Sequence, residues 1–216
     1  MSLEKIGRGQ FRQILGNINA ALEKEKQYLS QLDSHIGDGD HGFGMANGFR
    51  IGFEKVSLAP KGSFEEDLRT IGIALIKEVG GVSGTIFGSL LLGMAMATKD
   101  RTELRLTDFC AMLAAGLALV QQRGKAEPGD KTMLDSLCPA LQSLKQSLAG
   151  GLSLVEAFRR AAQEAQQGAE QTKNMIGKHG RAKYFREKSI GFQDAGATTM
   201  AVIISTISQS LAGIEA

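Results

Sequence analysis

Apolar residues recur at steps of three and four along most of the chain, which is the spacing of an amphipathic helix. In the first such stretch the apolar positions are Phe11, Ile14, Leu15, Ile18, Leu22 and Leu29, and they predict a helix over residues 5–31. The same spacing predicts seven further helices, over residues 42–56, 64–78, 84–98, 106–123, 132–149, 153–172 and 196–213. No segment shows convincing strand alternation, and the β-branched residues 202–204 lie inside a longer helical stretch. The pattern therefore predicts an all-α protein of eight helices.

Residues with helix-capping chemistry precede several of these segments. Ser63 is followed by an acidic first turn, and Thr107 with Asp108 opens a long apolar helix. Ser153 and Glu156 have the spacing of a capping box, in which each side chain accepts from the other residue's backbone amide. These signals mark helix starts independently of the apolar pattern.

The order of the connections predicts where unusual chemistry gathers. Short connections favour antiparallel neighbours, so the connections after the odd-numbered helices all lie at one end of an up-and-down bundle. Those four connections carry the glycine-rich and charged sequences, at residues 33–42, 80–84, 124–132 and 173–196. The other three are ordinary polar turns, at residues 57–63, 99–105 and 149–152. The sequence therefore predicts an antiparallel bundle or barrel with one composite site at one end.

Length, composition and charge exclude several classes of protein. The 216 residues, 43% of them hydrophobic, suit a single domain over residues 1–216. A net charge of +2 gives no argument for binding nucleic acid or a membrane surface. Cys110 and Cys138 form no disulfide framework, and we expect buried thiols in a reducing cytosol. With no signal peptide and no apolar stretch longer than residues 109–120, we expect a cytoplasmic location.

An acidic loop is the strongest candidate for chemistry. Asp33, Asp38 and Asp40 lie within eight residues among glycines that let the backbone turn several carboxylates toward one point. Converging carboxylates repel one another unless a cation neutralises them, and oxygen ligands favour Mg²⁺ or Ca²⁺ over Zn²⁺. A calcium-binding EF-hand fits poorly, because its sixth and twelfth positions would be Asp38 and Gly44. The loop predicts a magnesium site that also binds phosphate, and the alternative is a solvated Asp-Gly turn.

Two further connections have sequences suited to anions. Residues 80–84 are a glycine-rich helix start, which can present free amides and the Ser83 hydroxyl to a phosphate. The alternative is a plain helix–helix turn. These residues match neither a Walker nor a Rossmann motif. In residues 129–132, Asp130 or Thr132 is a candidate helix cap, and Lys131 is either a surface lysine or a phosphate ligand.

The last odd connection is about twenty residues long, which is typical of a binding loop or lid. Arg181 offers a planar fork for phosphate oxygens, and Asp194 with Gly196 forms a turn into the last helix. The alternative is a disordered excursion. His41, which directly follows Asp40, is either a ligand contact or a packing residue.

Taken together, the four motifs resemble the nucleotide-binding L subunit of dihydroxyacetone kinases, which is also the C-terminal domain of the single-chain ATP-dependent enzymes. The resemblance extends over residues 32–48, 80–88, 123–139 and 180–199. It implies an eight-helix antiparallel barrel with an adenine nucleotide, ADP or ATP, at one end. It also implies two Mg²⁺ ions held by Asp33, Asp38 and Asp40.

The resemblance implies a set of nucleotide contacts and a role for one arginine. The contacts are His41, Gly42, Phe43, Gly44, Val82, Ser83, Gly124, Met133, Arg181, Asp194, Ala195 and Gly196. Arg181, with Mg²⁺, would position and neutralise the transferred phosphoryl group. The family often has asparagine where Gly44 stands and proline where Ala195 stands.

The family's activity implies that this polypeptide works with partners. The sugar is held covalently on a histidine of a separate K subunit, so this chain alone is expected not to phosphorylate a ketose. In the phosphotransferase form, bound ADP is rephosphorylated by a phosphohistidine protein, the M subunit. One alternative is a two-chain ATP-dependent kinase for dihydroxyacetone or another small ketose. Another is an ADP-dependent regulatory protein that contacts a transcriptional regulator. We expect a monomer that joins a hetero-complex.

Overall fold

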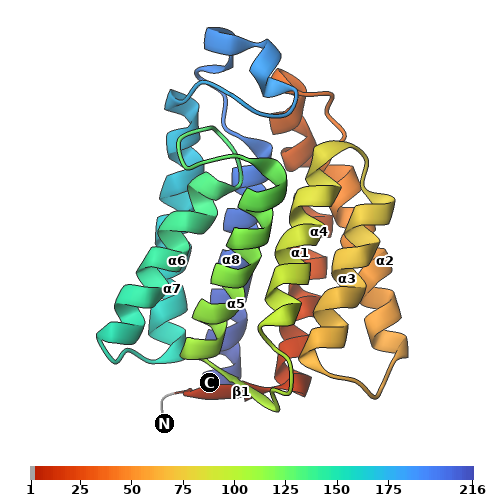
Figure 1. Cartoon of the computed structure of the whole chain (residues 1–216), viewed down its shortest axis with the longest axis vertical. Helices are drawn as coiled ribbons and strands as arrows, with labels where there is room; N and C mark the ends of the chain where they lie inside the picture. Colours follow the sequence, from red (N-terminus) through yellow and green to blue (C-terminus); the bar gives the residue numbers. More distant parts are fainter. Residues whose placement is uncertain (1–2) are drawn as a thin grey trace.

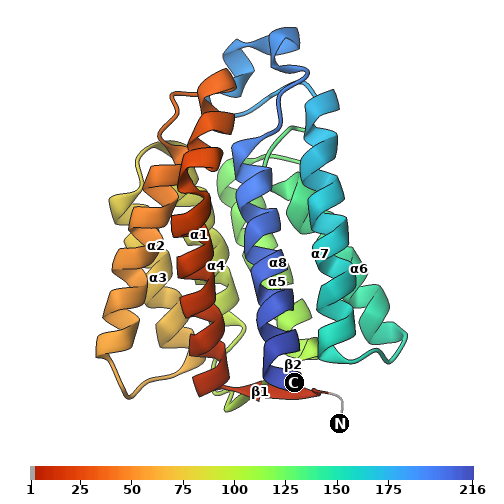
Figure 2. The same cartoon turned by 180° about the vertical axis from the view of Figure 1, so that it is seen from behind.

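A computed structural model describes residues 3–216, and within them eight antiparallel helices form a closed ring (Figure 1). The helices are α1 (Arg8–Ile36), α2 (His41–Leu58), α3 (Phe64–Glu78), α4 (Gly81–Met96), α5 (Leu106–Gly124), α6 (Leu134–Ala149), α7 (Leu154–Gln171) and α8 (Ala195–Glu215). Each helix packs on the next along the chain, and α8 packs on α1, which closes the ring. Figure 2 shows α1 and α8 side by side. The predicted eight-helix antiparallel arrangement is confirmed.

The apolar positions of the sequence pattern form the core of the ring. Leu22 and Leu29 of α1, Met45 of α2 and Phe158 of α7 are fully buried. Burying a side chain of this size contributes about 1.5–3 kcal/mol. Helix α7 also approaches α6 closely at Gly168. A Cβ at this position would lie only 1.9 Å from a backbone oxygen at the start of α6, so the approach requires glycine. This contact fixes where α6 begins, next to the predicted site.

Two short strands correct the expectation that the chain has none. Strand β1 (Lys5–Gly7) pairs antiparallel with β2 (Glu103–Arg105) at the end of the bundle opposite the predicted site. Ile6 faces Leu104 across this pair, and both side chains are buried. The first helix therefore starts at Arg8 instead of residue 5. With three residues in each strand, the sequence offers no alternation long enough to detect.

A buried carboxylate fixes the same end of the bundle. Asp67, in the first turn of α3, accepts hydrogen bonds of 2.8–3.0 Å from the guanidinium groups of Arg8 and Arg12. The two arginines also donate to the carbonyl oxygens of Ala59 and Pro60. Burial alone raises the pKa of Asp67, but the hydrogen bonds from Arg12 and Arg8 outweigh it and hold the pKa below its ordinary value. Asp67 thus ties α1 to the turn between α2 and α3.

Several helix starts are capped as predicted. Ser63 and Glu66 form a capping box at α3. At α7 half of the predicted box is present: the Ser153 side chain accepts from the Glu156 amide, but the Glu156 carboxylate accepts from Arg159 and Arg160 instead. The first helix, however, runs five residues beyond its predicted end, to Ile36, so Asp33 lies on α1 and not in a loop. Gly37 ends the helix with φ −141° and ψ −146°, and a Cβ there would lie 2.1 Å from a side-chain oxygen of Asp33, so the position requires glycine.

The long last connection is ordered and lies over one end of the ring. Residues 172–193, the cap segment, contain three short 3₁₀ helices, η1 (Thr172–Asn174), η2 (Ala182–Tyr184) and η3 (Arg186–Ser189). Figures 1 and 2 both show it, in light blue, above α7 and α8 and beside the end of α1. The structure therefore favours the predicted lid or binding loop over a disordered excursion.

Helix α8 has the length and apolar composition of a membrane span. Within its most apolar window 56% of the residues are buried inside the bundle, where the helix packs against α1, α6 and α7. These contacts identify α8 as a helix of the bundle core.

Candidate functional site

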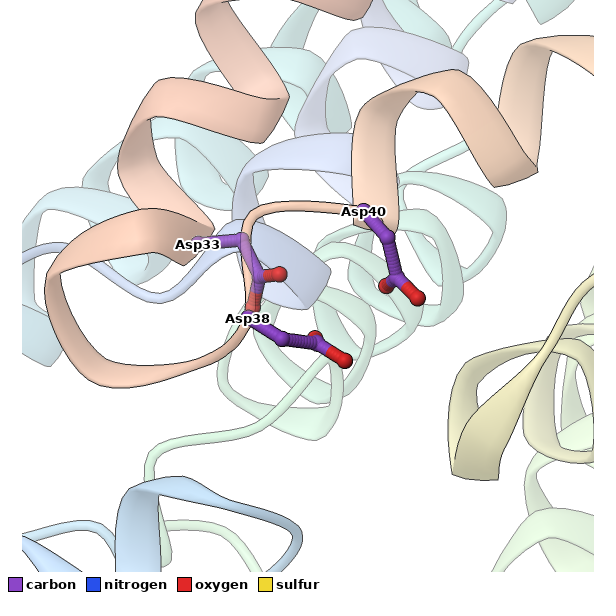
Figure 3. Close-up of side chains that lie close together, drawn as sticks. All are labelled: Asp33, Asp38 and Asp40. Carbon is purple, nitrogen blue, oxygen red and sulfur yellow. The ribbon is translucent and has the colours of Figure 1, made fainter.

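Three aspartates converge beside the start of α2. Asp33 comes from the last turn of α1, Asp38 from the connection, and Asp40 is the N-cap residue of α2. Oxygen atoms from the three side chains lie within 4.8 Å of one another, and Figure 3 shows the carboxylates around a common space. One Asp33 oxygen also accepts from the backbone amide of Gly39 at 2.8 Å, which holds the loop against α1. Gly39 has φ +79°, a conformation that favours glycine.

The cluster carries more negative charge than the protein neutralises. In the part of the chain that the structure describes, Arg181 is the cation paired with it, through Asp38. Burial raises the pKa of Asp40, and the neighbouring charges of Asp38 and Asp33 raise it further, against a smaller opposing effect of Arg181. A cation that prefers oxygen ligands would relieve this repulsion. The donor set and its spacing therefore fit Mg²⁺.

His41 connects the helices around the site through hydrogen bonds of its side chain. Its buried ring lies 3.0 Å from the Ser83 hydroxyl through Nδ1 and 2.8 Å from the Thr199 hydroxyl through Nε2. Burial lowers the pKa of His41 to about 4, although the charge of Asp33 opposes this, so the ring is neutral near pH 7. His41 thus joins the first turns of α2, α4 and α8, and both ring nitrogens are occupied by protein hydroxyls.

A cavity of about 690 Å³ adjoins the aspartates. Because the helices alternate in direction, α2, α4, α6 and α8 all begin at this end, and each contributes residues to the cavity wall. Amides in the first turn of a helix have no acceptor inside the helix, and they bind anions well. Helix α4 has no side-chain cap, and its first residue, Gly81, has φ +69°. Its first turn is therefore open to a phosphate.

The deeper part of the cavity is apolar. Ile86 and Phe87 of α4, Val120 of α5 and Leu134 of α6 line it. The Asp38 and Asp40 carboxylates and Arg181 belong to the same lining and are more exposed than these apolar residues. An elongated ligand with a charged end and an apolar ring system matches this distribution.

All but three of the predicted site residues line this cavity. Those that do are Asp33, Asp38, Asp40, His41, Val82, Ser83, Gly124, Met133, Arg181, Asp194, Ala195 and Gly196. Thus the four connections predicted to meet do so at one end of the ring.

Gly42, Phe43 and Gly44 lie outside the lining. A Cβ on Gly42 would lie 2.0 Å from the Lys26 carbonyl oxygen, so this glycine lets α2 pack on α1. Phe43 is 51% exposed, with the Lys26 ammonium 5.7 Å from its ring centroid. Gly44 faces Val79. Their nucleotide contacts stay predictions.

Lys131 and the start of α6 differ from the predictions. The Lys131 side chain is 2% exposed and its ammonium donates to backbone carbonyls, so it is not a surface lysine. Asp135 accepts from the Thr132 amide at 2.7 Å, while Thr132 Oγ1 accepts from the Leu134 amide. Asp130 instead accepts from Lys178 and His179 of the cap segment. No sequence pattern distinguishes a lysine that binds carbonyls from one in solvent.

Other lining residues lie outside the motifs that the sequence shows. Ile86 and Phe87 follow Val82 at helical steps of four and five, and Thr85 lies between them and the glycine-rich start. Helical periodicity would have placed Ile86 on the side of Val82 and Phe87 on the side of Ser83, since each follows that residue by four. Tyr184, 75% exposed on the cap segment, also lies at the cavity and carries no signal in the sequence.

Asp194 closes the site from the α8 side. Its carboxylate accepts from the Ala197 amide at 2.7 Å and caps α8. Burial raises the pKa of Asp194 to about 7; the Ala197 amide and Lys131 oppose this rise, whereas Asp135 and Asp33 add to it. The predicted turn into the last helix is thus present, and its aspartate, whose pKa is raised, lies at the cavity wall.

Comparison with known proteins places the chain among the subunits of dihydroxyacetone kinases. The model of the DAK2 domain matches residues 35–209. The ADP-binding subunit DhaL of the PEP-dependent dihydroxyacetone kinase of Escherichia coli K12 is 39% identical over 195 residues, 90% of this chain and 93% of that protein. The ADP-binding subunit DhaL of the PEP-dependent dihydroxyacetone kinase 2 of Listeria innocua is 35% identical over 203 residues, 93% of this chain and 94% of that protein.

A solved structure shares the fold. The dihydroxyacetone kinase of C. freundii in complex with AMP-PNP and Mg²⁺ superposes with a TM-score of 0.67 at 22% identity. The alignment covers 96% of this chain and 35% of that one. At this identity the similarity establishes the architecture alone.

Proposed function

We propose that this chain, which belongs to the DAK2 domain family and is a dihydroxyacetone kinase subunit of the ADP-binding type, holds Mg²⁺-bound ADP or ATP in the end cavity. The observation that carries the proposal is the convergence of three carboxylates with four helix N-termini on one cavity. Residues 1–216 act as one nucleotide-binding domain in this proposal, in the cytoplasm.

Each part of the cavity has a role in holding the nucleotide. Asp33, Asp38 and Asp40 are the ligands for two Mg²⁺ ions, which when bound neutralise phosphate oxygens. The open first turn of α4, with Val82 and Ser83, donates to the phosphates. The apolar wall receives the adenine ring. Support comes from the fit of these features to the ligands named for the similar proteins, ADP and AMP-PNP with Mg²⁺.

Arg181 is the residue of this chain that contacts the transferred phosphoryl group. Its guanidinium pairs with Asp38 at the mouth of the cavity. The Arg181 side chain is 65% exposed. Binding of Mg²⁺ by Asp38 would compete with that pair and free the fork for phosphate oxygens. The arginine then stabilises charge that is spread over the phosphoryl oxygens as the group moves.

The nucleotide acts as a relay in this proposal. A phosphoryl group leaves the histidine nitrogen of the M subunit and bonds to the terminal oxygen of ADP, which gives ATP. The same group then passes to a hydroxyl oxygen of dihydroxyacetone bound on the K subunit, the hydroxyl proton is released, and ADP is restored. The similar proteins of Escherichia coli and Listeria innocua belong to PEP-dependent kinases, which supports this donor over free ATP.

The rim of the cavity suits alternate docking of two partners. Val82 and Tyr184 are large side chains that are more than half exposed, and Lys183 lies 4.9 Å from the Tyr184 ring centroid. Arg186 and Lys188 add exposed positive charge to the same segment. Aromatic side chains with basic neighbours are typical of protein interfaces. Native mass spectrometry of the mixed subunits tests this, and absence of any binary or ternary complex counts against it.

Nucleotide content is the direct test of the proposed function. The protein is purified in Mg²⁺ buffer and denatured, and the released nucleotide is identified by chromatography, with Asp38→Ala as the comparison. Near-stoichiometric ADP that is lost in the variant supports a resident coenzyme and the relay. Protein that is empty as purified but binds ATP reversibly with Mg²⁺ favours the two-chain ATP-dependent kinase. No nucleotide binding under either condition rejects the proposal.

A further inference from the structure

The two ends of the cap segment meet through a backbone hydrogen bond. The Gly191 amide donates to the Lys173 carbonyl oxygen at 2.7 Å, so the segment leaves the bundle and returns to it at neighbouring positions. A loop closed in this way moves as a unit if the closure opens. Arg181 lies on that loop, between the two ends.

Lys131 lies under the closure and binds both ends. Its ammonium donates to the carbonyl oxygen of Thr172 at 2.6 Å, to that of Met175 at 3.3 Å, and to that of Phe192. The first two acceptors belong to the outgoing end of the loop, and the third belongs to the returning end. A lysine ammonium has three donors, and here all three are used within the protein.

The surroundings of Lys131 are those of a built contact. Burying an ammonium is costly unless each donor is satisfied, and this side chain is 2% exposed with three acceptors. Lys131 also adopts φ +62°, a backbone conformation that is uncommon for a residue with a side chain. Burial lowers the pKa of the ammonium, and the nearby carboxylates of Asp194 and Asp135 oppose that effect. The geometry thus serves the contact with the cap segment.

Two further side-chain anchors of the segment lie nearer its surface. Lys178, whose side chain is 61% exposed, and His179 bind Asp130, and the His35 ring stacks on Phe192 with centroids 4.7 Å apart. Lys131 reaches both ends from inside, and the buried Thr172 hydroxyl also joins them by accepting from the Asp194 amide at 2.9 Å. Removal of the Lys131 ammonium would take a donor from one buried and two partly buried carbonyl contacts, which costs free energy as long as the loop stays closed.

We propose that Lys131 is a positioning residue for the nucleotide site: its buried ammonium pins both ends of the cap segment and so holds Arg181 over the aspartates and the cavity closed. This inference rests on the proposed function, because it assigns the closed segment to nucleotide retention. Lys131 also lines the cavity, but its ammonium donors are directed to the segment and not to the cavity, so we assign it to the segment. Release of nucleotide requires the segment to lift, and Lys131 sets how often it does.

Lys131→Met tests the proposal against Lys173→Met as the matched control. Both replace a lysine by an uncharged chain of similar length, but Lys173 is exposed and contributes its backbone carbonyl, not its side chain, to the closure. Two readouts are needed. Hydrogen exchange without nucleotide reports opening of residues 172–193, and displacement of a fluorescent ADP analogue in Mg²⁺ reports the dissociation rate.

We expect Lys131→Met to speed exchange in the cap segment but not in α7, and to speed nucleotide release by about tenfold to a hundredfold. Lys173→Met should change neither. Unchanged protection of the segment in Lys131→Met overturns the pin, and faster exchange with an unchanged release rate overturns the role in nucleotide retention. If Lys131→Met fails to fold, Lys131→Gln, which retains an amide donor, replaces it with a smaller expected effect of the same sign.

The design separates this inference from the proposed function. If the wild-type chain binds no nucleotide, the proposed function and the retention role both fail. The exchange comparison then still decides whether Lys131 holds the segment closed, because that measurement uses protein without ligand.

Discussion

The two ends of the helical ring treat their carboxylates in opposite ways. At the end with the strands, one buried aspartate, Asp67, is held by two arginines that also bind backbone carbonyls. At the cavity end, three aspartates share a single arginine within the described residues. In the first arrangement the protein itself neutralises the negative charge of the carboxylate. In the second, negative charge remains for a ligand to neutralise. The comparison teaches that charge balance, more than residue type, separates a structural carboxylate from a binding one.

Asp38→Asn should produce the largest effect, a loss of ADP affinity without a loss of stability. The substitution removes a metal ligand and the partner of Arg181, so we expect the affinity for ADP in Mg²⁺ to fall by about a hundredfold or more. Without Mg²⁺ the free energy of unfolding should stay the same or rise, because repulsion with Asp33 and Asp40 is relieved. Calorimetric titration and urea unfolding measure the two quantities. Undiminished ADP affinity would show that the aspartates are not the metal site.

Asp67→Asn should produce the converse result. Breaking a buried ion pair costs about 3–5 kcal/mol, and we expect about 2–3 kcal/mol here because the arginine side chains are 20–21% exposed. The ADP affinity of the folded variant should match that of the wild type, since the substitution lies in the first turn of α3, which begins at the other end of the ring (Figure 1). Urea unfolding and the same titration check this. A large loss of affinity would mean that the two ends are coupled.

The sequence was sufficient for the arrangement of the site because helix parity depends on features that periodicity reveals. Counting helices places the connections that contain Asp38, Ser83, Lys131 and Arg181 at one end, without any knowledge of side-chain contacts. The aspartate cluster was equally predictable, since three acids and several glycines in eight residues have few other uses. These predictions rest on local composition and on topology.

Other features depend on contacts that local sequence does not encode. Ile6 and Leu104 pair across almost a hundred residues, in strands too short to show a period. The burial of Lys131 depends on carbonyl oxygens supplied from residues 172–192. The exposure of Phe43 depends on which side of α2 faces α1, and there Gly42 occupies the contact. Each of these is decided by a distant partner.

The acid stability of the protein should sharpen the comparison at the strand end. The pKa of Asp67 is held below its ordinary value of 3.8, so its stabilisation is present above that value and is lost as pH falls through the folded-state pKa. The difference in unfolding free energy between wild type and Asp67→Asn should therefore be constant from pH 7 to about pH 5 and shrink below about pH 4. Urea unfolding of both proteins across this range measures it. A difference that grows on acidification would contradict the assignment.

The smallest expected effect concerns the start of a helix at the cavity end. Helix α3, at the other end, begins with a complete capping box, whereas α8 has its Asp194 cap but alanine at its first position, where the family often has proline. Proline is favoured there because the first amide of a helix has no acceptor within it. Asp194 already has φ −73° and ψ 129°, the extended conformation that a following proline requires. Ala195→Pro should therefore raise the free energy of unfolding by about 0.5–1 kcal/mol, through a less flexible unfolded chain.

Ala197→Pro is the matched control for that gain. Its amide donates to Asp194 Oδ2 at 2.7 Å, so the same substitution two residues later removes the cap bond and should lower the free energy of unfolding by about 1 kcal/mol or more. Urea unfolding without nucleotide separates these effects from ligand contacts at Ala195. If Ala195→Pro destabilised the protein as much as Ala197→Pro, the α8 start would be held by tighter packing than its dihedral angles indicate. Changes of opposite sign in the free energy of unfolding would show that the start of α8, at the cavity end, is less rigid than the fold permits.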